Sequence, residues 1–258
     1  MNTNNLKIVA VIFMIIDHFA YYFHYAISTE LYTWCRILGR ISMPIFVYLL
    51  VQGYFNTKSL KKYKIRLFIS AVITQGLILI VKYINLKYYN YYTINVYDIL
   101  NILFSMFLSL ILICLIDRKV LYANNFITSV FDKLIRLAFI IGIVILYLKL
   151  NFDYKYFLPL LAISIYIVEK FREFFEWEIC NIWYKVILVN VLVILLILSS
   201  VILSEINLFA ILSILFIVFY NGKLWKKSKF MKYIFYIIFP LQHIILYLSA
   251  MILYTKLI

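Results

Sequence analysis

An aspartate and a histidine stand next to each other inside the first long apolar run of the sequence. Asp17 and His18 lie about midway along residues 6–26. An ionisable side chain in a membrane span costs about 3 kcal/mol to insert, so it marks either a structural contact between helices or a functional site. Because a histidine beside a carboxylate is the usual arrangement of a general base, the pair indicates proton-transfer chemistry.

Two arginines and a proline follow at helical spacing in the second apolar run. Arg36, Arg40 and Pro44 are four residues apart and therefore lie on one face of a helix. Pro44 has no N–H for the carbonyl of Arg40, which predicts a local distortion beside that arginine. Arg36 is near the start of the run, and its side chain could extend to the membrane interface. We expect the deeper Arg40 to point inward, where it could pair with Asp17, bind an anion or stabilise an oxyanion.

The last apolar run also combines a proline with an ionisable residue. His243 follows Pro240 by three residues. The proline leaves the carbonyl of Tyr236 without its helical partner, so the run predicts a polar site at this depth, although a lone structural histidine is the alternative. Asp98 is a further acidic residue at the start of a run. The uncharged polar residues inside the runs are Gln52, Gln75, Asn101, Asn190 and Gln242.

The composition places these residues in a membrane protein. Apolar types make up 66% of the 258 residues and charged types 14%, whereas a soluble domain has roughly half apolar and a quarter charged residues. The net charge of +14 would favour nucleic-acid binding in a soluble protein. Here the basic residues fall in short segments between apolar runs, which indicates orientation in the membrane and contact with anionic lipid headgroups. We expect no nucleic-acid partner.

Nine apolar segments approach the roughly 20 residues that a membrane-spanning helix needs. We therefore predict an all-α bundle of about nine transmembrane helices that forms a single domain over residues 1–258. The first segment lacks a small-residue cleavage site, which favours a retained span over a signal peptide. The segments are 6–26, 34–55, 66–83, 98–116, 134–150, 155–169, 183–203, 206–220 and 232–254.

Lysine and arginine alternate between rich and poor loops, and this pattern predicts the orientation. With the N-terminus in the cytoplasm, the basic segments 56–66, 117–136 and 221–232 all lie on the cytoplasmic side, where such residues gather. The segment 169–182 fits less well because it also carries four glutamates. Nine spans then put the C-terminus outside, and the basic cytoplasmic loops could attract an anionic cofactor.

Several motifs of soluble enzymes are absent from the sequence. It has no glycine-rich nucleotide loop, no HExxH and no GxSxG. The three cysteines lack the CxxC spacing of zinc sites, so we expect no metal. An anionic cofactor would have to be held by arginine and lysine side chains and by helix ends.

Four short strings occur in order along the apolar runs: IDH, GR-x3-PIF, YNGK and FP-x2-H. In this order the sequence resembles the TraX family of bacterial integral membrane proteins over most of its length. The resemblance implies N-terminal acetylation of a conjugative pilus subunit, with acetyl-CoA as the expected donor. The family is also similar to a wider group of membrane acyltransferases that includes the lysosomal heparan-glucosamine acetyltransferase.

The resemblance also implies roles for particular residues. Those expected in catalysis are Asp17, His18, Arg40 and His243. Those expected to bind acetyl-CoA, with Arg66 added from the basic segment 56–66, are Arg40, Gln52, Arg66, Gln75, Asn101 and Asn221.

The leading hypothesis is acyl transfer from acetyl-CoA to an amine or hydroxyl in the bacterial cytoplasmic membrane. His18, helped by Asp17, would take the acceptor's proton, and Arg40 would lie near the developing oxyanion or the donor's phosphates. A route through an acyl-histidine stays open. The acceptor could be a pilin-like protein, a peptide, a lipid or a cell-wall glycan.

Two alternatives belong to other functional classes. A proton-coupled transporter also fits the intramembrane ionisable residues and the two helices that contain proline. A non-catalytic scaffold would use the same polar residues only to join helices.

Overall fold

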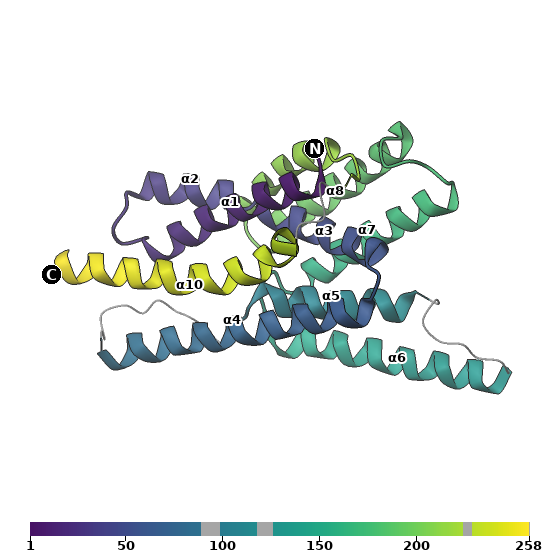
Figure 1. Ribbon diagram of the computed structural model, residues 1–258, viewed down its shortest axis with the longest axis horizontal. Coiled ribbons are helices and arrows are strands. Elements are labelled where there is room, and N and C mark those ends of the chain that lie inside the picture. Colours follow the sequence, from purple (N-terminus) through teal and green to yellow (C-terminus); the bar gives the residue numbers. More distant parts are fainter. Residues whose placement is uncertain (89–98, 118–125, 224–228, 258) are drawn as a thin grey trace.

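A computed structural model describes residues 1–88, 99–117, 126–223 and 229–257, and these residues form a bundle of helices (Figure 1). Asp98 and the tyrosine-rich segment before it lie outside the described residues. The helices are α1 (Thr3–Tyr22), α2 (Thr29–Gly39), α3 (Ser42–Asn56), α4 (Leu60–Tyr88), α5 (Ile102–Ile116), α6 (Phe126–Lys149), α7 (Phe157–Phe174), α8 (Ile182–Ile202), the 3₁₀ helix η2 (Glu205–Leu212), α9 (Ser213–Val218) and α10 (Lys229–Leu257).

Five helical stretches among the described residues are long and apolar enough to cross a membrane. They are Thr3–Tyr22, Thr29–Asn56, Leu60–Val81, Ile182–Ile202 and Phe235–Leu253. Helix α5 is apolar but has only 15 residues, which is short of the roughly 17 that spanning requires. The segment predicted at 206–220 is a 3₁₀ helix followed by the short α9 rather than one continuous helix. The protein is thus a helical membrane protein, whereas the count of nine spans and the orientation stay predictions.

Helix α3 forms the centre of the bundle. Every residue from Ser42 to Gln52 is buried, and the helix packs against α1, α5, α7 and α9. The sequence explains this position, because the stretch from Met43 to Val51 has no charged side chain that would require water. Helices α1, α10 and α4 lie side by side in that order (Figure 1).

The second predicted span is interrupted rather than continuous. Helix α2 ends at Gly39, and α3 begins at Ser42. Pro44 explains the break, because its ring excludes the carbonyl of the residue four positions earlier, Arg40, and supplies no N–H to it. The predicted distortion beside Arg40 is therefore present, and it places this arginine at the junction of two helices.

Helix α10 continues through Pro240 without an interruption. The proline frees the carbonyl of Tyr236 as the sequence predicts. The hydroxyl of Ser70 on α4 donates to this carbonyl over 3.3 Å. The unpaired backbone group thus becomes a contact between α4 and α10.

Two residue pairs form a small parallel β ladder between loops. Strand β1 (Ile99–Leu100) pairs with β2 (Asn151–Phe152), and the N–H of Asp153 also donates to the carbonyl of Leu100 over 3.1 Å. The ladder fixes the turn between α6 and α7, in which Tyr154 adopts a left-handed backbone with φ of 58°. This conformation is uncommon for a residue with a side chain, and it brings Tyr154 to the junction of α2 and α3.

Candidate functional site

Asp17 on α1 binds two arginines at once. Nη1 of Arg36 lies 2.9 Å and Nη2 of Arg40 3.1 Å from the same oxygen, Oδ1, of Asp17. Arg40 also donates from Nη1 to the hydroxyl oxygen of Tyr154 over 2.9 Å. Of the three roles open to Arg40 in the sequence, the structure forms the pair with Asp17, and Arg36 joins the same cluster rather than extending away from it. These contacts tie α1 to the α2–α3 junction.

Gly39 allows this close approach of α1 and α2. A Cβ atom added at Gly39 would lie 2.3 Å from both the Cβ and the Oδ1 of Asp17. No side chain fits at such a distance, so the GR pair acts as a unit: the glycine admits the carboxylate and the arginine binds it.

Tyr154 contributes a neutral hydroxyl to the cluster. Burial raises the pKa of Tyr154 to about 12, although the guanidinium of Arg40 opposes this shift. The phenol therefore stays protonated near neutral pH and adds no negative charge beside Arg40.

His18 turns to α10 instead of to the carboxylate of Asp17. Its ring centroid lies 4.6 Å from that of His243, with an angle of 41° between the ring planes. Successive residues of a helix point about 100° apart, which explains why Asp17 faces α2 while His18 faces α10. The two residues thus point in different directions from α1, and His18 meets a second imidazole, that of His243, which the sequence did not predict.

Only one ring nitrogen of His243 has a hydrogen-bond partner in the described part of the chain. The hydroxyl of Tyr22 lies 2.9 Å from Nδ1 of His243. Its Nε2 is buried and has no hydrogen-bond partner in the described part of the chain. Such an unpaired buried nitrogen is costly and rare outside functional sites. A pair of imidazoles with a free nitrogen can accept and pass on a proton.

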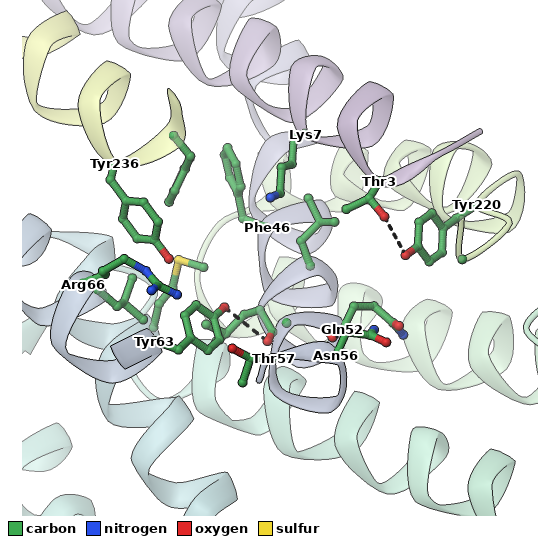
Figure 2. Close-up of a pocket in the computed structure, with 17 residues that line it drawn as sticks. Thr3, Lys7, Phe46, Gln52, Asn56, Thr57, Tyr63, Arg66, Tyr220 and Tyr236 are labelled. Atoms are coloured by element: carbon green, nitrogen blue, oxygen red, sulfur yellow. Dashed lines mark hydrogen bonds between the residues drawn. The ribbon is translucent and has the colours of Figure 1, made fainter. Parts of the chain in front are cut away.

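A cavity of about 220 Å³ lies between α1, α3, α4 and α10 (Figure 2). Its two charged side chains are Lys7 from α1 and Arg66 from α4. The Nε of Arg66 is buried without a hydrogen-bond partner in the described chain. Because both charges are positive and the described chain pairs neither with a carboxylate, the cavity favours an anionic ligand.

A row of aromatic rings connects this cavity with the two histidines. Phe46 and Phe235 line the cavity and pack with ring centroids 4.6 Å apart. Phe235 is 5.9 Å from Phe239, which in turn lies 6.0 Å from His18. Lys7 and His18 are both on α1, roughly 16 Å apart along the helix axis. A continuous series of ring contacts thus runs from the cavity to the imidazole pair.

Comparison with known proteins decides the family. The sequence matches the family described as TraX protein over residues 2–249. The chain belongs to the TraX family. It is also 36% identical over 70 residues to the probable fimbrial assembly protein FimC, serogroup H1, of Dichelobacter nodosus, a match that covers 27% of this chain and 28% of that protein. No solved structure matches the chain.

In this TraX-family protein, two of the residues expected to bind acetyl-CoA line the cavity, namely Gln52 and Arg66. Gln75 and Asn101 lie elsewhere: Oε1 of Gln75 accepts from the backbone N–H and from Nδ2 of Asn101, at 3.0 and 2.9 Å. The side chain of Asn101 also caps the start of α5. These two residues join α4 to α5.

Asn221 belongs to a turn at the edge of the cavity. Its Oδ1 accepts from the N–H of Lys223 over 3.1 Å. The next residue, Gly222, has φ of 72° and lines the cavity, and an added Cβ would lie 2.5 Å from Ile179. Tyr220 and Gly222 of the YNG string therefore line the cavity, and the side chain of Asn221 holds the turn between them.

Glu169 is the residue that the sequence analysis missed. Its side chain is fully buried and binds Gln52, Tyr184 and Arg172. The only signal in the sequence is the spacing of Glu169 and Arg172, which places an acid and a base on one face of a helix. Among the described residues, no group of three or more histidine, cysteine, aspartate or glutamate side chains is placed to hold a metal ion.

Proposed function

We propose that this protein is a membrane-embedded acyltransferase that moves an acetyl group from acetyl-CoA to an amine or hydroxyl. The observation that carries the proposal is the connection of a positively charged cavity, through one row of aromatic rings, to a buried imidazole pair. Such a site can hold an anionic donor at one end and accept a proton at the other.

The cavity suits the anionic part of the donor. Lys7 and Arg66 would bind phosphate groups, and the free Nε of Arg66 offers a donor that the described protein itself does not use. At about 220 Å³ the cavity is smaller than the roughly 300–1,000 Å³ of pockets for drug-sized ligands, so it would hold only part of the molecule. Acetyl-CoA supplies the acyl group in activated form, as a thioester.

The imidazole pair would carry out the proton transfers. As the acceptor nitrogen or oxygen bonds to the acyl carbon, His18 takes its proton, and the carbon–sulfur bond breaks. The proton then leaves with the thiol through His243, whose Nε2 is free. Arg40 is held by Asp17 and Tyr154, so we assign it the role of fixing α1, and with it His18, in place.

The proposed acceptor is the N-terminal amine of a pilin-like protein. Membership of the TraX family and the similarity to a protein named as a fimbrial assembly protein both support a role in pilus biogenesis. We place this activity in the bacterial cytoplasmic membrane.

The experiment is a transfer assay with purified protein in lipid nanodiscs. The protein is incubated with a synthetic peptide that copies a pilin N-terminus and with acetyl-CoA whose acetyl group is isotopically labelled. Mass spectrometry should find the label on the peptide's α-amine with wild type and at background levels with His18→Ala. Equal labelling with both proteins would contradict the proposal. If acetyl-CoA stays intact and a substrate moves into proteoliposomes, the results would favour a transporter instead.

A further inference from the structure

Gln52 is the point where a buried carboxylate meets the cavity. Its side chain lines the cavity, and its Nε2 donates to Oε1 of Glu169. Glu169 is on α7, behind the cavity wall, with no exposed surface. The amide nitrogen of Gln52 is therefore fixed by the protein, in a side chain that lines the cavity.

The groups that form hydrogen bonds with the Glu169 side chain in the described part of the chain are all donors. Besides Gln52, the hydroxyl of Tyr184 donates to Oε1, and Nε of Arg172 donates to Oε2 over 2.7 Å. A carboxylate paired with arginine is an acceptor only. Gln52 can thus bind Glu169 only through its nitrogen, which leaves the carbonyl oxygen Oε1 for the cavity. The surrounding network, rather than the identity of Gln52 alone, sets this orientation.

We propose that the cavity selects a ligand that carries both an anionic group and an N–H donor, and that Glu169 sets this selectivity by holding Gln52 with its carbonyl toward the ligand. Lys7 and Arg66 bind the anionic group, and Gln52 accepts the hydrogen bond. The inference rests on the proposed function only for the ligand's identity, since coenzyme A combines phosphates with amide N–H groups.

The test compares two probes by calorimetry in nanodiscs. Coenzyme A has both features, and inorganic pyrophosphate is anionic but has no N–H donor. We expect Gln52→Leu to weaken coenzyme A binding about five- to tenfold, because one hydrogen bond contributes about 1 kcal/mol, and to leave pyrophosphate binding unchanged. Arg66→Gln should weaken both probes.

Glu169→Gln provides the second variant and keeps the side chain's size. Its amide can accept or donate, so Gln52 is no longer held in one orientation. The affinity for coenzyme A should fall while that for pyrophosphate stays, with the thermal unfolding midpoint measured for each variant as a check on folding. A loss of both affinities in Gln52→Leu, or of neither, would overturn the inference.

Failure of this inference and failure of the proposed function give different results. Wild type that binds neither probe, or coenzyme A binding that pyrophosphate does not compete with, would overturn the anion site. Labelled peptide in the transfer assay would still support acyl transfer in that case. Conversely, selective binding of coenzyme A without any transfer would keep the inference and contradict the proposed reaction.

Discussion

The imidazole rings of His18 and His243 pack against each other, although they come from the first and the last helix of the chain. Their centroids are 4.6 Å apart, and Phe239 touches both rings, at 6.0 Å from His18 and 5.5 Å from His243. The contact requires α1 and α10 to be neighbours, as they are in Figure 1. It defines the reactive end of the proposed site.

Replacing either imidazole should remove acetyl transfer. Because a positioned general base or acid contributes roughly 10²–10⁴-fold to a rate, we expect His18→Ala and His243→Ala each to lower the turnover number by at least about 100-fold. His24→Ala is the matched control, since His24 is exposed near the end of α1. Steady-state assays in nanodiscs measure all three, and a variant of either paired histidine that keeps wild-type turnover would remove it from the mechanism.

Tyr22 should act through His243. The hydrogen bond between its hydroxyl and Nδ1 of His243 fixes the ring, and the loss of one hydrogen bond costs about 1 kcal/mol, so Tyr22→Phe should slow transfer about fivefold. In a His243→Ala background the same change should have no further effect. A double-mutant cycle measures this coupling, and independent, multiplicative losses would show that Tyr22 acts elsewhere.

Gly39 and Gly76 should respond to alanine in opposite directions. An added methyl group at Gly39 would collide with Asp17 at 2.3 Å, and such overpacking costs about 1–3 kcal/mol. At Gly76 nothing lies within 4 Å of the new atom, so the better helix propensity of alanine should keep or raise stability by up to about 1 kcal/mol. Thermal unfolding in detergent compares the two, and equal midpoints would contradict the packing at Gly39.

The Asp17–Arg40 ion pair should show strong coupling. Removing one partner of a buried pair costs about 3–5 kcal/mol because the other charge is left uncompensated. The side chains are partly exposed, Asp17 by 15% and Arg40 by 11%. We therefore expect a loss of stability near the lower value. Asp17→Asn and Arg40→Gln should each lower the unfolding midpoint. The double variant should lose less than the sum of the two, and strictly additive losses would mean that the contact is not stabilising.

The sequence predicted the features that depend on one helix or on its hydrophobicity. The composition indicates a helical membrane protein, and the depth of Asp17 and Arg40 made their pairing one of the alternatives, because two charges in a low-dielectric interior stabilise each other. The effect of Pro240 on the carbonyl of Tyr236 was also predictable, since it follows from covalent geometry. The donor that satisfies this carbonyl, Ser70, comes from another helix and could not be predicted.

The remaining features depend on which helices are neighbours. Asp17 and His18 are adjacent in the chain but face different helices, so the sequence could not predict which side chains each of them meets. In the sequence, Glu169 is one of four glutamates in segment 169–182. Only the packing of α7 against α3 and α8 shows that its side chain is buried. The count of nine spans stays a prediction, because hydrophobicity alone does not distinguish a span from a short apolar segment such as 206–220, which folds as a 3₁₀ helix followed by α9.

The release of coenzyme A from acetyl-CoA tests the central claim most directly, because it needs no knowledge of the acceptor. A thiol-reactive dye would follow the reaction of purified protein in nanodiscs, with wild type, His18→Ala, His243→Ala and the control His24→Ala assayed side by side. We predict slow thiol release by wild type and His24→Ala, and background rates for the two other variants. Equal rates in all four proteins, or no release and no donor binding by wild type, would contradict the assignment as an acyltransferase.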